Sequence, residues 1–294
     1  MRVGSFRAGA TIMVISAALF AVMSAQVRGL TGVDSYITMM MRFGIGAAVV
    51  GGLHAGGLTH SRWTNWPWLI TRGVTGGFAV AALFWGIQHV GLAKATMYCY
   101  TYAIFAAVFA GPVLGEYMKG RQWAAVGLAT VGMALLVGVQ NLTIGSADLI
   151  TLSSGVLSGV AVVAIAKCRE TESSSGIFLS QCVFGLLLVA WPACHRWVAP
   201  TAAQWCALAS IGLLATAGQL AMTYAYKYTG AAYGSLLSLL TPVMSAAIGV
   251  TYFGEAPGTG FYVGSLLVLV ACAYLSFDPV RRPQAAIETG ATSP

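Results

Sequence analysis

The residues of this chain that could bind a solute lie inside long apolar segments, where water does not reach their polar groups. Tyr98, Thr101 and Tyr102 carry hydroxyl groups within one such run. Tyr98 and Tyr102 are four residues apart and so share a helix face, and Thr101 adjoins it. Tyr100 is expected to point elsewhere. Tyrosine rings can line a pocket while their hydroxyls orient a polar group, so we expect this face to bind a solute; the alternative is aromatic packing between helices.

A second run carries Ser235, Ser238 and Thr241 at intervals of three, which also places them on one helix face. Pro242 follows, and a proline cannot donate a backbone hydrogen bond, so the carbonyl of Ser238 is expected to be free. These hydroxyls and this carbonyl could contact a ligand. The alternative is that Ser and Thr bond back to their own helix and the proline only bends it.

Four further polar or aromatic residues in apolar runs are candidates for solute contact: Trp85, Gln88, Gln219 and Tyr226. A glutamine within lipid must find a partner, either on a neighbouring helix or in a cavity. Gln88 lies near a helix end, where water suffices. Gln219 lies deeper and is the stronger candidate, with a structural bond between helices as the alternative.

Arg42 is about seven positions inside its apolar segment. An unpaired guanidinium in hydrocarbon costs several kcal/mol, so this side chain must face a polar group. One hypothesis is that it holds a substrate carboxylate or gates a cavity. The alternative is that it extends to the lipid headgroups or binds helix-end carbonyls.

Glu116 and Glu255 follow two apolar segments, and negative charge at a helix C-terminus opposes the helix dipole. Each is expected to pair with a basic group or to cap the next helix, as a structural hinge rather than a catalyst. All eight acidic residues lie at helix ends, in loops or in the tail. A proton relay through a deeply buried carboxylate is therefore not expected. Any movement of a solute would use another group for proton coupling, or would occur by exchange or by facilitated diffusion without a proton.

The elements that position these residues follow from composition. Of 294 residues, 58% are hydrophobic and 8% are charged, which predicts a polytopic all-α membrane protein. Each predicted helix can cross about 30 Å of hydrocarbon. The ten expected helices cover residues 8–27, 35–57, 66–88, 94–115, 121–140, 148–167, 175–194, 203–226, 230–253 and 257–277.

Basic residues indicate the orientation of these helices. Arg28, Lys94, Arg196 and Lys227 lie on one side. The side of the termini receives ten: Arg2, Arg7, Arg62, Arg72, Lys119, Arg121, Lys167, Arg169, Arg281 and Arg282. Cytoplasmic loops are enriched in Lys and Arg, so both termini are expected in the cytoplasm. The positive charges follow the loops, which gives no support for nucleic-acid binding.

The sequence contains no motif for metal binding, cofactor binding or catalysis. The six cysteines form no CxxC or Cys/His pattern, so neither a metal site nor a cofactor is expected. The four histidines lie near loops, without an HExxH sequence or a Ser/His/Asp set. An enzyme is therefore not expected.

The chain also repeats itself. Leu92 to Glu116 reads LAKATMYCYTYAIFAAVFAGPVLGE, and Ala231 to Glu255 reads AAYGSLLSLLTPVMSAAIGVTYFGE, so both end on Gly-Glu, 139 residues apart. Arg42-Phe43 adds to these motifs. Together they resemble the EamA-type branch of the drug/metabolite transporter superfamily.

The resemblance implies ten transmembrane helices in two inverted five-helix repeats around a central cavity. The repeats are expected over 1–142 and 143–277, followed by a disordered cytoplasmic tail over 278–294. Family members usually have a proline thirteen residues before each Gly-Glu glutamate. Pro242 keeps it, whereas Ala103 replaces it, so a polar opening is expected in the ninth helix only.

We therefore expect a secondary transporter that exports an amino acid or related zwitterion by alternating access across the inner or plasma membrane. A small-molecule substrate and membrane lipid are the expected partners of a monomer. The alternative is uptake or exchange of a larger, nucleoside-like or vitamin-like metabolite. A channel or an intramembrane enzyme fits the duplicated sequence less well.

Overall fold

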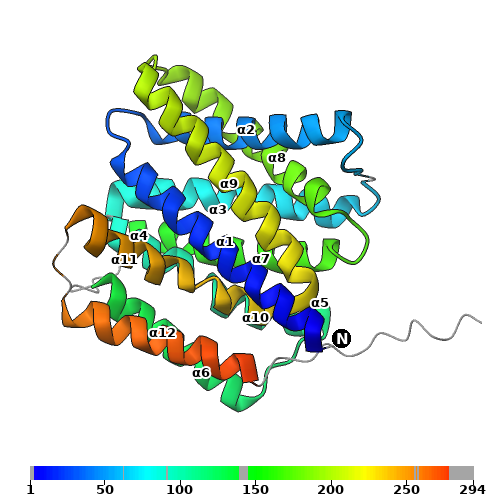
Figure 1. The fold of residues 1–294 in the computed structure, drawn as a ribbon, viewed down its shortest axis with the longest axis vertical. Coiled ribbons are helices and arrows are strands. Elements are labelled where there is room, and N and C mark those ends of the chain that lie inside the picture. Colours follow the sequence, from blue (N-terminus) through cyan, green and yellow to red (C-terminus); the bar gives the residue numbers. More distant parts are fainter. Residues whose placement is uncertain are drawn as a thin grey trace, which may run out of the picture.

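The protein is a bundle of helices (Figure 1). The computed structural model describes residues 3–61, 63–90, 92–138, 145–254, 256 and 258–277. Its helices are α1 (Val3–Gly29), α2 (Ser35–Ala55), α3 (Trp66–Val90), α4 (Leu92–Tyr100), α5 (Tyr102–Leu114), α6 (Gly120–Val137), α7 (Ser146–Cys168), α8 (Ser174–His195), α9 (Ala202–Thr229), α10 (Ala231–Leu237), α11 (Leu240–Phe253) and α12 (Thr259–Phe277). The expected tail and Glu255 lie outside the described residues.

These helices account for ten membrane spans. Within the described residues, nine helical segments are long and apolar enough to cross a membrane, with α4–α5 and α10–α11 each forming one segment. The tenth span is the apolar helix α12. The predicted all-α, ten-helix membrane fold is confirmed.

Spans four and nine are both interrupted, which corrects the prediction of an opening in the ninth span only. The first interruption lies at Thr101, between α4 and α5. The Thr101 hydroxyl and backbone N–H both donate to the Tyr98 carbonyl. A threonine side chain that competes for a backbone carbonyl can disturb a helix, so this break forms without a proline.

The second interruption precedes Pro242, as expected, but its carbonyl is not free. The Thr241 N–H donates to the Ser238 carbonyl at 3.0 Å. A tighter turn thus satisfies the group that proline leaves without its usual partner. The predicted free carbonyl at Ser238 is wrong.

The two halves interlock in a pattern that repeats when they are exchanged. α1 packs on α9, and its counterpart in the second half, α7, packs on α3. α2 packs on α8 and α6 packs on α12, so each meets its own counterpart (Figure 1). Each half contains five spans, an odd number, so the second half enters the membrane from the opposite side. This is the arrangement of inverted repeats.

Glycines bring α7 close to the first interruption. A Cβ at Gly159 would lie 2.5 Å from the Cβ of Phe105, and one at Gly155 would meet Thr101. Small residues allow helices in lipid to approach this closely. The broken fourth span is therefore held tightly against α7 on one side, while its other side remains available to line a space.

Glu116 follows the end of span four and joins the two halves by contacting the start of span nine. Its carboxylate is 1% exposed and accepts hydrogen bonds from the N–H groups of Ala231 and Ala232, at 2.9 and 3.2 Å. It thus caps α10, and the negative charge meets the positive end of that helix dipole. Glu116 was predicted to pair with a basic group or to cap the next helix along the chain, which is α6. At the start of α6, Gln122 accepts a hydrogen bond from the Lys119 N–H.

Candidate functional site

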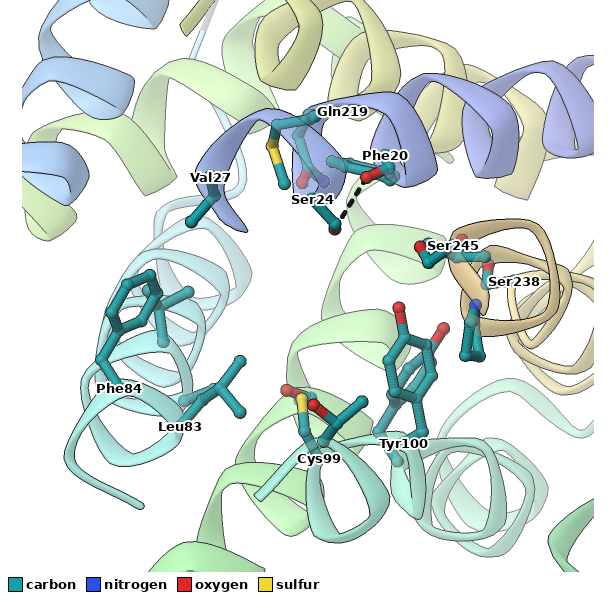
Figure 2. A pocket seen from close by; sticks show the side chains of 18 of the residues that line it. Phe20, Ser24, Val27, Leu83, Phe84, Cys99, Tyr100, Gln219, Ser238 and Ser245 are labelled. Atoms are coloured by element: carbon teal, nitrogen blue, oxygen red, sulfur yellow. Dashed lines mark hydrogen bonds between the residues drawn. The ribbon is translucent and has the colours of Figure 1, made fainter. Parts of the chain in front are cut away.

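A cavity of about 560 Å³ lies between the two halves (Figure 2). Both interrupted spans contribute to it: Tyr100 and Tyr102 flank the first break, and Ser238 and Thr241 flank the second. Its walls are mostly apolar, with Phe20, Leu83 and other residues from α1, α3 and α9. Its size lies within the range of pockets that hold small organic ligands.

The tyrosines that line the cavity differ from those expected. Tyr100 and Tyr102 line it, with ring centroids 5.8 Å apart, and Figure 2 shows the Tyr100 hydroxyl pointing into the space. The interruption at Thr101 places Tyr98 in α4 and Tyr102 in α5, so the four-residue spacing does not put them on one continuous helix. Neither Tyr98 nor Thr101 is among the lining residues. Their expected contact with a solute stays a prediction that this geometry does not support.

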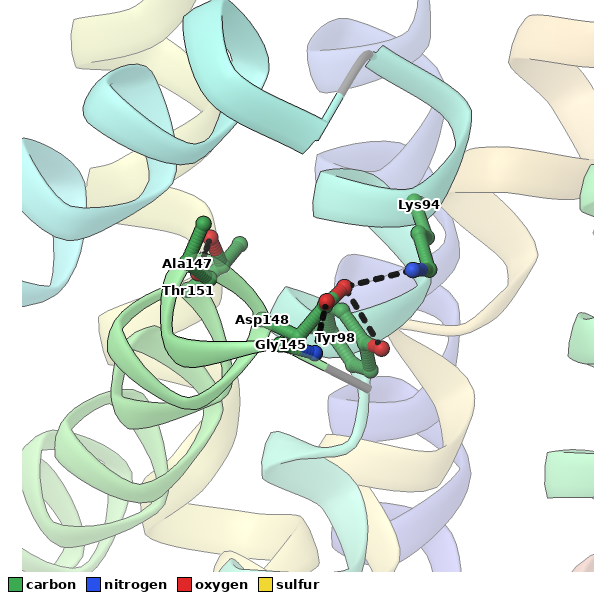
Figure 3. Close-up of polar contacts among 6 residues, drawn as sticks. All are labelled: Lys94, Tyr98, Gly145, Ala147, Asp148 and Thr151. Carbon is green, nitrogen blue, oxygen red and sulfur yellow. Dashed lines mark hydrogen bonds and ion pairs between the residues drawn. The ribbon is translucent and has the colours of Figure 1, made fainter. Parts of the chain in front are cut away.

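Tyr98 belongs instead to a polar cluster (Figure 3). Its hydroxyl donates to Asp148 Oδ1 at 3.0 Å, and Lys94 Nζ lies 2.6 Å from the same oxygen. The other Asp148 oxygen accepts from the Gly145 N–H at 2.7 Å, at the start of α7. This Lys94–Tyr98–Asp148 cluster therefore connects α4 to α7.

The hydroxyls of the ninth span are partly satisfied within the protein. Ser238 lines the cavity, yet its hydroxyl donates to the Gly234 carbonyl at 3.0 Å. Ser235 is fully buried outside the lining and donates to the Ala232 carbonyl. For these two serines the structure shows the local bonding that was the alternative interpretation. Thr241, Pro242 and Ser245 complete this wall.

Gln219 of α9 lines the cavity opposite Tyr100 (Figure 2). It is 3% exposed, and its Nε2 has no hydrogen-bond partner among the described residues. A buried donor without a partner costs about 1–3 kcal/mol, so a bound solute that accepts this bond would remove the penalty. Gln219 is thus the predicted candidate whose surroundings most favour solute contact.

The remaining candidates are Trp85, Gln88 and Tyr226, none of which is among the described lining residues. Trp85 stacks on His89 with ring centroids 3.8 Å apart and does not line the cavity. The side chain of Gln88 lies outside the described residues. Tyr226 is completely buried outside the lining, and its hydroxyl has no partner within the described part of the chain. Solute contact by these three residues stays a prediction.

Arg42 faces the cavity from α2. Its guanidinium carbon lies 6.0 Å from the Phe20 ring centroid and 5.9 Å from that of Phe43, distances at which a cation is attracted to the ring face. No described carboxylate lies within ion-pair distance of it. The expected polar surroundings of Arg42 are therefore the cavity itself.

Arg72 is a cavity residue that sequence reasoning missed, because it was counted among the loop cations. It is 3% exposed in the second turn of α3, and its Nη2 donates to Gln181 Oε1 at 2.6 Å. Without Arg72, nine basic residues remain on the side of the termini, which still exceeds the four on the other side. Its position inside the expected 66–88 helix was the signal that could have identified it.

Arg28 also lines the cavity, near the end of α1. Three arginines therefore contribute to the lining, whereas no Asp or Glu does so among the described residues. Lining residues supply the nearest charges in a space of low dielectric, where electrostatic interactions are strong. The cavity is consequently suited to a ligand with negative charge.

The cavity reaches one end of the bundle. Arg28, Val137 and Phe253 lie at or near the last residues of α1, α6 and α11, which are odd-numbered spans and so end at the same face. At the other face, Glu116 caps α10, and Phe6 packs on Tyr233 with ring centroids 4.9 Å apart. The bundle is therefore open toward one face and closed at the other.

Comparisons with known proteins agree with this architecture. The model of the EamA-like transporter family matches residues 7–138 and 145–277, one match in each half. The chain is 25% identical to a pseudopaline exporter of Pseudomonas aeruginosa over 277 residues, covering 92% of this chain and 96% of that protein. It is 27% identical to a riboflavin transporter of Rhizobium johnstonii over 227 residues, covering 74% and 73%.

A solved structure is also similar, with a TM-score of 0.77 and 18% identity over 90% of this chain and 97% of that one, which supports the fold. Because the family model covers both halves, the chain belongs to the EamA-like transporter family and is a multi-pass membrane transporter for a small molecule.

Proposed function

We propose that this protein moves a small, carboxylate-bearing metabolite, an amino acid or related zwitterion, by alternating access. The observation that carries the proposal is the cavity between the two repeats, which reaches one face of the bundle while the other face is closed. A carrier requires such a space, whereas a channel requires a path that is open to both faces.

The residues of the cavity suit the parts of such a cargo. Arg42 would bind the carboxylate, because a guanidinium can donate two parallel hydrogen bonds to its oxygens. The hydroxyl oxygens of Tyr100 and Thr241 and the side-chain oxygen of Gln219 are acceptors for a protonated amine. The apolar walls would accept the remainder of the molecule.

Alternating access would exchange the state of the two faces. The closed face would open by separating Glu116 from α10 and Phe6 from Tyr233. The open face would close as the helix ends at Arg28, Val137 and Phe253 approach each other. Inverted repeats favour this motion, since each half can adopt the conformation of the other.

The orientation proposed from the basic residues places both termini and the closed face in the cytoplasm, in the inner or plasma membrane. The described state would then be open to the outside, as an exporter is after release of its cargo. The similarity to a protein named as an exporter supports this direction. We propose that the transporter acts as a monomer, with both repeats in one chain.

The second candidate function is uptake or exchange of a larger, vitamin-like metabolite. Two observations favour it: the cavity of about 560 Å³ exceeds the volume that a small amino acid fills, and one relative is named as a riboflavin transporter. The two candidates differ in cargo and direction but share the cavity and the mechanism.

A flux assay tests both candidates. The purified protein is reconstituted in liposomes, and the movement of labelled amino acids, riboflavin and nucleosides is followed with and without a pH gradient. The proposal predicts saturable flux of an amino acid. Saturable flux of riboflavin or a nucleoside alone would favour the second candidate. Chemical conversion of a compound without flux would contradict both.

A further inference from the structure

We propose that the cargo carries two acidic groups, one held by Arg42 and the other by Arg72. This inference rests on the proposed transport function and narrows its substrate class. It begins from a feature that a single carboxylate does not explain: two guanidinium groups from different helices, α2 and α3, line the same cavity.

Arg72 is oriented for binding rather than neutralised. Gln181 accepts from its Nη2 at 2.6 Å, and this neutral amide fixes the direction of the side chain without cancelling its charge. The Nε of Arg72 is buried and has no partner in the described structure. A structural arginine at this depth would be expected to pair with a carboxylate, because a buried cation without an anion is costly.

The two arginines lie on one space of low dielectric, because Arg42 of α2 and Arg72 of α3 line the same cavity. Two like charges repel strongly where water is scarce. An anion near both would replace this repulsion with attraction, so the cavity favours a negatively charged ligand over a neutral one.

The charge balance distinguishes between classes of cargo. A zwitterion with a single carboxylate supplies an anion to one guanidinium and leaves the other without one. A molecule with two acidic groups supplies one anion to each guanidinium. Dicarboxylates have this chemistry, and so do molecules with one carboxylate and one phosphate, because arginine forks bind either group in a bidentate manner.

The lining also limits what else the cargo contains. The cavity walls include Phe84, Leu83 and Val27 (Figure 2). These side chains favour an apolar or aromatic portion beside the acidic groups. The inferred cargo is thus an amphipathic molecule with two acidic groups.

Matched pairs of compounds test the inference, since the members of each pair differ in one acidic group. The pairs are glutamate and glutamine, and N-benzoylglutamate and N-benzoylglutamine, so one member of each pair has two carboxylates and the other has one. The full-length protein in detergent is titrated with each compound, and the shift in its thermal unfolding gives a Kd. The same compounds are then followed in liposome flux assays.

The expected result is that the member with two carboxylates binds about tenfold or more tightly than its partner in at least one pair. In Arg72→Gln this preference should disappear, while affinity for the member with one carboxylate changes less than about twofold. Arg72→Lys keeps the charge without the fork and should give an intermediate value. Lys167→Gln removes a charge outside the cavity, at a residue paired with Glu170, and should keep the preference.

Each result has a distinct meaning. Binding without preference in all pairs would overturn the inference, and flux of the same compounds would leave the proposed function intact. A preference that persists in Arg72→Gln would overturn the role of Arg72. A preference for the member with two carboxylates without any flux would support the inference about the cavity and contradict the proposed function. The wild-type comparison tests the inference even where Arg72→Gln does not fold.

Discussion

The polar side chains of the cavity divide into those that the protein already satisfies and those that it leaves without a partner. The Ser238 hydroxyl donates to the Gly234 carbonyl, whereas Gln219 Nε2 is buried without a described partner. A ligand gains little from a group that must first break an internal bond. Both residues line the cavity, so Gln219 should contribute more to the free energy of cargo binding than Ser238.

This difference predicts opposite outcomes for two substitutions. Gln219→Leu keeps the size of the side chain but removes the donor, and should raise the KM for transport by about five- to tenfold. Ser238→Ala should change KM by less than about twofold. Initial flux rates over a range of cargo concentrations in liposomes measure both. Equal effects of the two variants would contradict the argument.

Arg42 gives a second prediction at this scale. Arg42→Leu removes the cation from the cavity and should abolish transport, about a hundredfold or more, since the bond to an anionic group is lost in a site of low dielectric. Its amount in the membrane should remain close to that of the wild type, because no described carboxylate depends on it. Normal transport by Arg42→Leu would eliminate the proposed contact.

Two tyrosines of span four are expected to have different roles, Tyr100 in cargo binding and Tyr98 in stability. Tyr100→Phe should raise KM about threefold with little change in thermal stability, since the hydroxyl faces the cavity. Tyr98→Phe should lower the free energy of unfolding by about 1 kcal/mol with little change in KM, since it loses its bond to Asp148. Flux and thermal unfolding of both variants check this, and a reversal would restore the original expectation for Tyr98.

At the scale of elements, the contact between Glu116 and α10 connects the first repeat to the second at the closed face. Gly230, just before α10, has φ +75° and faces the carboxylate; an added Cβ would lie 2.6 Å from Glu116 Oε1. A side chain there is both strained and obstructed. The glycine allows the carboxylate to reach the N–H groups of the helix end.

Loss of this cap should weaken the closed face. Glu116→Gln removes the charge that meets the helix dipole, and Gly230→Ala displaces the carboxylate; each should destabilise this state by about 1 kcal/mol. Both variants should therefore increase the fraction of molecules in which the cavity opens at the face that is closed here. Hydrogen exchange at the start of α10 measures the change, with Lys167→Gln as a control at a partly exposed ion pair. Unchanged exchange would show that the cap does not hold this face.

The two interrupted helices also show which elements could be predicted. Pro242 marks the second break in the sequence, because its missing N–H is a property of the residue itself. The first break has no proline and depends on the bond from Thr101 to the Tyr98 carbonyl and on close packing against Gly155. Such a break depends on tertiary contacts and was not visible in the sequence pattern.

At the scale of the whole molecule, the ten spans could be predicted because length and hydropathy are local properties. The identity of the lining residues could not, since the rotation of each helix is set by its neighbours. Arg72 illustrates this: the same residue suits a headgroup or a cavity, and packing of α3 on α7 and α8 decides between them. The expectation of two inverted repeats came from resemblance to a family rather than from periodicity, and the pairing of helices between the halves was not predicted.

The central claim is that the cavity is exposed to one face at a time, and cysteine labelling from each side tests it most directly. In a variant whose six native cysteines are replaced by alanine, Ser245→Cys places one thiol in the cavity. A membrane-impermeant maleimide is applied to one side of sealed vesicles, and then to the other. In a separate variant, Lys167→Cys in the last turn of α7 reports which side of the vesicles the maleimide reaches.

The account predicts labelling of the Ser245→Cys thiol from the face where α1 ends, protection from the opposite face, and increased labelling from that opposite face in Glu116→Gln. Simultaneous labelling from both faces would indicate a channel, and no labelling from either face would indicate a solid centre. Either result would contradict a carrier built from two inverted repeats.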